Sequence, residues 1–199
     1  MTYAMHVRSL ILSVTVAAVL SSCTIGDPYG LTMMPTPYGT VVGQLQGDRH
    51  RVEQVALNAV VLDSGARLGL RIAKVTDGTF NTEVRLRDSA ELTLHLRTTP
   101  HALSSDHQSG VRLRMSLTHA EVVNDEGRVQ RYDLELDTAK PVVVNIVNDG
   151  RHMNITLGCT DLGSITTNLP STEWVVLEPS GRGRVELVDP TFIPLYGKH

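Results

Sequence analysis

The sequence LTLHLR, residues 92–97, places an apolar side chain at every second position. The same alternation runs through VRLRMSLT, residues 111–118, and DLELD, residues 133–137. Successive side chains of a β-strand point to opposite faces of a sheet, so a period of two indicates strands with one buried face. Helical spacing is nearly absent, and no capped amphipathic run of about ten residues stands out. The chain is therefore predicted to be all-β.

Five turn signals divide the alternating stretches into candidate hairpins. Pairing the strands on either side of each turn sets apolar residues against apolar residues, as a half-buried sheet requires. A turn at Asp149-Gly150, for instance, brings Val144 opposite Ile155. The predicted turns are Ser64-Gly65, Thr76-Asp77-Gly78, Asn124–Gly127, Asp149-Gly150 and Ser180-Gly181.

Roughly nine to eleven antiparallel strands with one apolar face each must pack as two sheets or close into a barrel. Irregular strand lengths favour an antiparallel β-sandwich built from hairpins, with a closed β-barrel as the alternative. We expect one all-β domain over residues 41–199, with Arg114 opposite Asp137 as a cross-strand ion pair. Charged outward positions argue against a lipid-facing barrel wall: Arg85, Arg87, Arg112, Arg114, Asp133, Glu135 and Asp137.

The first 23 residues carry a targeting pattern. Arg8 precedes an uncharged, largely apolar run over residues 9–22, which is typical of a secretory signal and short for a membrane-spanning helix. Leu20-Ser21-Ser22-Cys23 resembles the lipobox of bacterial lipoprotein precursors. The resemblance implies that residues 1–22 are a lipoprotein signal peptide and that Cys23 is the lipid attachment site, labelled by palmitate. A plain secreted protein is the alternative.

The same resemblance suggests a location in the cell envelope. Lipoproteins kept at the inner membrane typically carry aspartate after the lipidated cysteine, and here that residue is Thr24. We therefore expect the protein on the outer membrane, at its periplasmic or its surface face. Residues 23–40 are rich in proline and glycine and are predicted to be a tether, with docking on the domain or a recognition site as alternatives.

Charge and cysteine content restrict the partners. The net charge of −3 does not support nucleic-acid binding, which needs a strongly basic surface. A lipidated Cys23 would leave Cys159 without a disulfide partner. We expect Cys159 to be a small buried residue at a strand end.

One polar loop carries residues with ligand chemistry. His101, Asp106 and His107 are suitable zinc ligands, but their spacing is not that of a structural zinc site. A solvated loop is the favoured interpretation, and a metal site is the weak alternative. No cofactor is predicted.

Motifs for catalysis are missing: we find no Gly-x-Ser-x-Gly, Ser-x-x-Lys, glycine-rich phosphate loop or His-Glu-x-x-His. The protein is therefore not expected to be an enzyme. Aromatic residues make up only 4% of the chain, and Trp174, alternating with Val176, is expected in the core. This composition argues against a strong lectin without excluding a weak one.

These observations favour a non-enzymatic envelope lipoprotein. Its all-β domain would bind an envelope protein partner or belong to an assembly, through exposed sheet edges that accept an added strand. The alternative is a module for a small ligand, a metal or a glycan that uses the His101–Gly110 loop.

Overall fold

The computed structural model describes residues 31–36, 39–46, 49–71, 77–98, 110–169 and 174–194. Over these residues the chain forms two antiparallel sheets and a short 3-10 helix, η1 (Arg49–Arg51). Sheet A has the order β1 (Leu31–Thr36), β2 (Gly39–Gln46), β5 (Arg67–Arg71), β14 (Trp174–Arg182), β7 (Ser89–Leu96), β8 (Val111–Met115), β9 (His119–Val123), β10 (Val129–Asp133). Sheet B has the order β13 (Thr160–Thr166), β12 (His152–Leu157), β11 (Val142–Asp149), β6 (Gly78–Leu86), β15 (Arg184–Pro194), β4 (Ala59–Asp63), β3 (Val52–Ala56).

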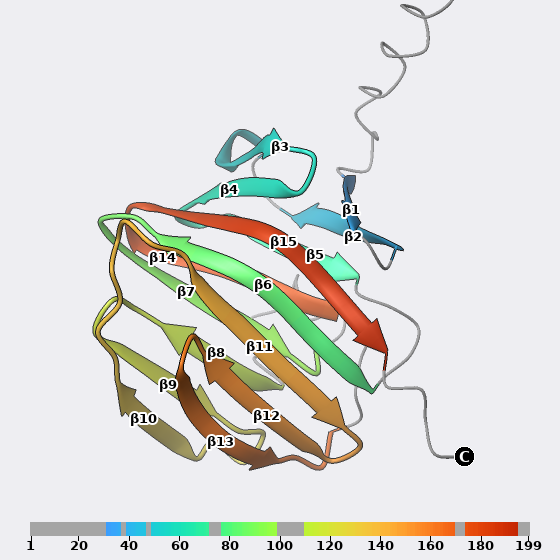
Figure 1. The fold of residues 1–199 in the computed structure, drawn as a ribbon, viewed down its shortest axis with the longest axis vertical. Helices are drawn as coiled ribbons and strands as arrows, with labels where there is room; N and C mark the ends of the chain where they lie inside the picture. The colour runs from blue at the N-terminus through green and yellow to red at the C-terminus, as the bar shows by residue number, and fades with distance from the viewer. Residues whose placement is uncertain are drawn as a thin grey trace, which may run out of the picture.

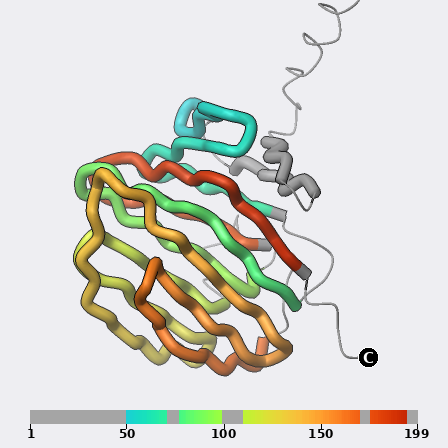
Figure 2. The backbone as a smooth tube through the Cα atoms, in the orientation of Figure 1, coloured from blue at the N-terminus to red at the C-terminus, as the bar shows by residue number. Residues whose placement is uncertain are grey.

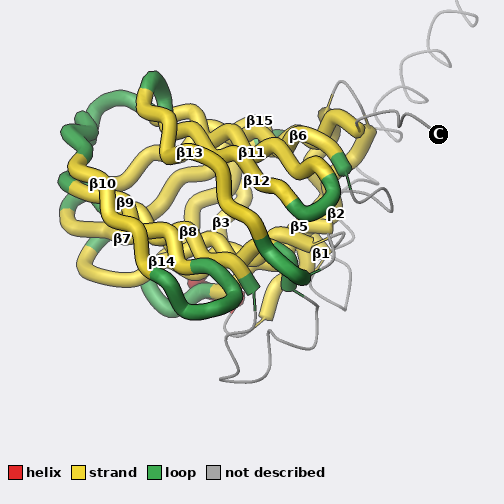
Figure 3. Tube along the Cα trace, turned by 90° about the horizontal axis from the view of Figure 1, so that it is seen from below, coloured by secondary structure: helices red, strands yellow, loops and turns green. Residues whose placement is uncertain are grey.

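The two sheets face each other as layers, so the predicted β-sandwich is confirmed and the sheets do not close into a barrel (Figures 1 and 3). The core lies between the layers and uses alternate residues of the inner strands, as β6 shows from Gly78 to Leu86. Fully burying one such Leu, Val or Phe contributes about 1.5–3 kcal/mol. The largest fully buried side chains are Phe80, Leu62, Leu68, Leu70, Leu92, Leu94, Leu113, Met115, Ile146, Met153 and Ile155.

One side of the sandwich is closed by a side chain. Tyr132 on the edge strand β10 donates a hydrogen bond from its hydroxyl to the carbonyl oxygen of Leu162 on β13, at 2.5 Å. β10 and β13 are the last strands of their respective sheets, so this bond joins sheet A to sheet B where no strand pairing does. The opposite side of the sandwich holds the other two edge strands, β1 and β3 (Figure 1).

Two of the five predicted hairpins are confirmed. β11 and β12 form one, but Val144 pairs with Leu157 rather than with Ile155, and the loop is Gly150-Arg151. This two-residue shift leaves the same side chains in the core, because a strand repeats its faces every two residues. The second hairpin joins β9 to β10 around residues 124–128.

The second hairpin is displaced because the predicted strand 111–118 ends early. Ser116 begins a turn in which its hydroxyl accepts hydrogen bonds from the backbone N–H groups of Thr118 and His119. Serine favours this local bonding over the sheet ladder. β8 consequently ends at Met115, and Arg114 lies opposite Glu121 instead of the predicted Asp137.

The other three predicted hairpins are wrong. The turns near residues 64–65, 76–78 and 180–181 each carry the chain from one sheet to the other, joining β4 to β5, β5 to β6 and β14 to β15. After such a crossing, the apolar side chains of the second strand still face those of the first strand, because both sets point into the core between the sheets. Apolar matching therefore cannot distinguish a hairpin from a crossing between layers.

Two expectations about the N-terminal half and the cysteines need correction. Part of the predicted 23–40 tether forms β1, which pairs with β2 and extends sheet A beyond the expected start at residue 41. β1 is an edge strand, the position at which a strand tolerates its Pro35. Cys159 is exposed and free, because it lies in the turn between β12 and β13 rather than within a strand. Within the described residues, no helix is long and apolar enough to cross a membrane.

Candidate functional site: a polar trough on sheet A

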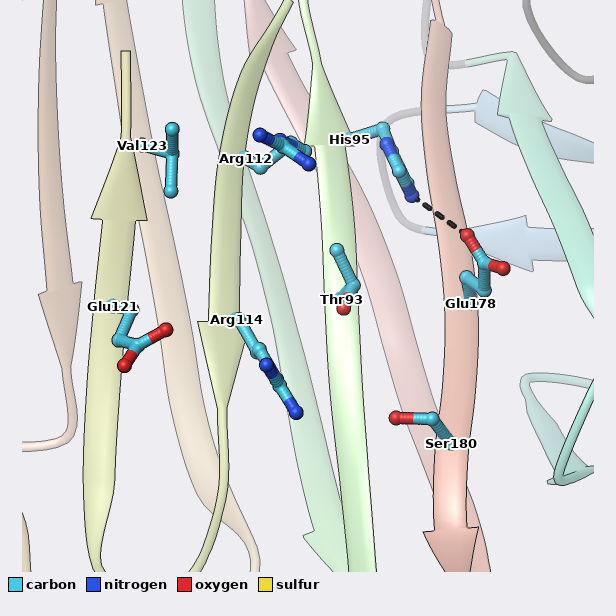
Figure 4. A pocket seen from close by; sticks show the side chains of 8 residues that line it. All are labelled: Thr93, His95, Arg112, Arg114, Glu121, Val123, Glu178 and Ser180. Carbon is cyan, nitrogen blue, oxygen red and sulfur yellow. Dashed lines mark hydrogen bonds and ion pairs between the residues drawn. The ribbon is translucent and has the colours of Figure 1, made fainter. Parts of the chain in front are cut away.

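The outer face of sheet A is hollowed over four adjacent strands. β14, β7, β8 and β9 enclose a cavity of about 350 Å³, which we call the trough. Figure 4 shows its side chains projecting from these strands on one face. The lining residues are Thr93, His95, Arg112, Arg114, Glu121, Val123, Glu178 and Ser180.

Opposite charges alternate across the floor of the trough. The strand registers place Thr93 opposite Glu178 on one side and opposite Arg114 on the other. Arg114 lies opposite Glu121, and Arg131 on β10 continues the row beyond it. The row therefore offers both guanidinium donors and carboxylate acceptors to a ligand lying across the strands.

Glu178 is the most strongly tied residue of the trough. Its Oε2 lies 3.0 Å from Nε2 of His95, and its Oε1 lies 3.1 Å from Nη2 of Arg67. The His95 side chain is only 15% exposed. Hydrogen bonding by His95, followed by that of Arg67, lowers the pKa of Glu178 from 4.5 to about 2 against the opposing effect of burial. Glu178 is thus an ionised, preoriented hydrogen-bond acceptor.

We expect Glu178 to make the free energy of unfolding depend on pH in the acid range. Its pKa is lower in the folded protein, so its contribution is present above pH 4.5 and is lost as the pH falls towards about 2. Thermal unfolding of the native protein and of Glu178→Gln, compared from about pH 6 to about pH 2, checks this. The difference between their midpoints should shrink below pH 4.5, and a difference that stays constant contradicts the assignment.

Arg114 is oriented from one side by Glu91. Its Nε lies 3.0 Å from Oε2 of Glu91, and its Nη2 contacts the same oxygen. This hydrogen bond raises the pKa of the Arg114 guanidinium. The pair holds the arginine across the trough without burying it, since its side chain is 48% exposed.

The site residues predicted from the sequence are not among those that line the trough. His101, Asp106, His107 and Cys23 lie outside the described residues. The loop that contains the first three leaves sheet A after Leu96 and returns at Val111, which pair with each other next to His95 and Arg112. No group of three or more metal-binding side chains occurs within the described part of the chain.

Arg97 differs from its expected outward position. It follows β7 with a φ of 54°, is only 6% exposed, and donates hydrogen bonds to three carbonyl groups. Its Nη1 lies 2.6 Å from the oxygen of Leu169, and its Nη2 lies 2.7 Å from that of Gly150 and 3.4 Å from that of His152. The left-handed backbone turns the side chain away from the face that strict alternation predicts.

The outward position of some trough residues could be predicted from the sequence, and that of others could not. Arg112 and Arg114 were correctly assigned to an outward face by alternation. Glu178 was missed because β14 was expected to pair with β15, whereas it lies between β5 and β7. Val175 and Leu177 of β14 belong to the core, and the side chain of Trp174, predicted to be buried, lies outside the described part of the structure.

Comparisons with known proteins support the fold. No family model and no curated protein matches the chain. Among solved structures it is similar to the Bacillus licheniformis beta-glucanase, with a TM-score of 0.58 and 11% identity over 85% of this chain and 100% of that chain. The Ca2+/Man-bound exoplasmic/lumenal domain of VIP36 gives a TM-score of 0.58 and 11% identity over 84% and 91%. The carbohydrate-binding module CBM66 of Bacillus subtilis gives 0.51 and 13% over 81% and 91%. At such identities the likeness shows the β-sandwich fold alone.

Proposed function

We propose that this protein is a lipid-anchored, non-catalytic binding module of the bacterial cell envelope, and that its trough holds a segment of glycan. The observation that carries the proposal is the row of alternating donors and acceptors across β14, β7, β8 and β9. A sugar presents hydroxyl groups that both donate and accept hydrogen bonds. A floor of mixed sign complements such a ligand better than it complements a uniformly charged one.

The choice of a glycan draws on the fold as well as on the trough. The similar solved structures include a carbohydrate-binding module, a beta-glucanase and a domain bound to Man. The described lining of the trough contains no Phe, Tyr or Trp, so binding would rest on hydrogen bonds rather than on stacking. This favours the weak, polar recognition that the low aromatic content suggests.

The low pKa of Glu178 excludes this residue as the general acid of a glycoside hydrolase. Glycoside hydrolysis typically requires one carboxylic acid that stays protonated near neutral pH, and therefore a raised pKa. The pKa of Glu178 is instead lowered to about 2 by His95 and Arg67. As a non-catalytic module, the protein should leave each glycan that it binds uncleaved after prolonged incubation.

The lipid anchor is proposed on the lipobox-like residues ending at Cys23. Expression in a bacterial host with labelled palmitate should label the native chain and leave Cys23→Ser unlabelled. Cys159→Ser is the matched control and should keep the label, because Cys159 is exposed in a turn far along the chain. Label on Cys23→Ser would contradict the anchor.

The glycan site is tested with two trough variants and one control. We expect Glu178→Gln and Arg114→Gln each to weaken binding about tenfold, since a hydrogen bond to a charged group is worth roughly 1.5–3 kcal/mol. Arg128→Gln, whose side chain is 80% exposed and outside the trough, should bind as the native chain does.

Binding is measured by calorimetry on the full chain, after a glycan array has selected the ligand. Circular dichroism of each variant checks that its secondary structure is retained, so that a loss of glycan affinity is not due to misfolding. Equal affinity of all three variants, or no glycan bound by the native chain, would contradict the proposal.

A further inference from the structure

The turn between β3 and β4 exposes apolar side chains. Leu57 is 73% exposed and Val55 is 50% exposed, two of the most exposed large apolar side chains among the described residues. They lie two positions apart at the tip of a single hairpin. Isolated surface leucines are ordinary, whereas adjacent ones on a projecting tip mark a contact surface.

Hydrogen bonds hold the tip in place. The side chain of Asn58 donates to the carboxylate of Asp189 on β15, and the backbone N–H of Asp189 donates to the carbonyl oxygen of Asn58 at 2.9 Å. The side chain of Gln54 donates to the carbonyl oxygen of Leu57 at 3.4 Å. The apolar tip is therefore held away from the core rather than folded back on it.

The hairpin lies on the side of the sandwich at which the chain enters the domain. β3 is the edge of sheet B and β1 is the edge of sheet A. β3 is joined through β4 to β15, and β15 also contacts β1. Figures 1 and 2 show the β3–β4 hairpin at the opposite end of the sandwich from β10 and β13. Leu31, the first residue of β1, thus begins on the same side as the apolar tip.

The chain between the proposed anchor and β1 is short. Eight peptide steps separate Cys23 from Leu31, a span of at most roughly 29 Å when fully extended. A lipid on Cys23 would therefore keep the β1 and β3 side of the sandwich near the membrane.

From these observations we propose that the β3–β4 tip is a second membrane contact, in which Leu57 and Val55 enter the interface of the bilayer that holds the lipid. The inference rests on the proposed anchor at Cys23. Two attachment points on one side would fix the orientation of the sandwich, whereas a single point of attachment leaves the domain free to rotate. Apolar side chains on a polar body are suited to this shallow position.

The test places a fluorescent label on the tip. The full chain is prepared with its lipid as Leu57→Cys in a Cys159→Ser background, labelled with an environment-sensitive dye, and reconstituted into phosphatidylcholine vesicles. A matched label replaces Val129, which is 60% exposed on β10 at the opposite side. We expect the Leu57 label to shift to the blue, to be quenched by brominated acyl chains, and to be several-fold less accessible to iodide than the Val129 label.

Other results overturn the inference in distinguishable ways. Equal iodide quenching of the two labels means that the tip stays in water. A Leu57 label that is shielded from iodide but not quenched by brominated lipid means that protein covers it, such as a second copy of the chain. A mass of the N-terminal peptide without acyl chains on Cys23 overturns the anchor and this inference together.

Discussion

Replacing Gly181 with alanine is expected to destabilise the protein by roughly 1–3 kcal/mol more than replacing Gly127 does. The two glycines have the same left-handed backbone, with φ values of +79° and +78°. Both substitutions therefore carry the same conformational cost of roughly 1–2 kcal/mol for a non-glycine residue. They differ only in the space that an added Cβ would meet.

At Gly127 an added Cβ meets nothing within 4 Å, whereas at Gly181 it would overlap the carbonyl oxygen of Ser89. Ser89 is the first residue of β7 and pairs with Arg182 of β14, so its backbone cannot move away from Gly181 without disturbing that pairing. Urea unfolding of the two variants and the native chain measures the difference. Equal free energies of unfolding would mean that β7 yields to the extra atom.

Replacing Arg97 with methionine is expected to destabilise the protein by roughly 1.5–3 kcal/mol. Methionine keeps much of the aliphatic packing, but it leaves the carbonyl groups of Leu169, Gly150 and His152 without their guanidinium donor. These carbonyls lie outside sheet A, in sheet B and its loops, so the substitution should also loosen the junction between the layers. Burial lowers the pKa of Arg97, and Asp77 and Asp125 oppose this effect.

Two further variants separate the roles of charge and geometry. Arg97→Lys keeps the positive charge, but an ammonium group is a point donor rather than a planar fork, so we expect an intermediate loss. Arg128→Met, at a side chain that is 80% exposed, should change the free energy of unfolding by no more than about 0.5 kcal/mol. An Arg97→Met variant as stable as the native chain would show that water replaces the guanidinium.

The sequence predicted the layers of this fold better than its connections. Alternation in residues 92–96 and 111–115 correctly separated buried from outward positions, because the faces of a strand are fixed by local geometry. Whether β14 follows its turn into a hairpin or crosses to the facing sheet is decided by packing far along the chain. Both arrangements satisfy the same apolar pattern, and for this reason three turns were misassigned.

In the trough, too, the outward positions within one strand could be predicted, whereas the contacts between strands could not. Arg112 and Arg114 could be placed outward from their own strand, but the partners of Arg114 depend on which strands lie beside β8. Because of the turn at Ser116, Arg114 lies opposite Glu121 rather than the expected Asp137. Its hydrogen-bond partner Glu91 is on β7. A binding surface made from four strands becomes visible only when their order is known, since no single stretch of the sequence contains it.

The positions of β14 and β15 have a consequence for how the molecule is made. Each lies in the interior of its sheet, with β14 between β5 and β7 and β15 between β6 and β4. Residues 174–194 are synthesised late, yet without them each sheet is split into two separate parts. A nascent chain therefore cannot complete either sheet before residues 174–194 have left the ribosome, so the two layers form together and late rather than strand by strand.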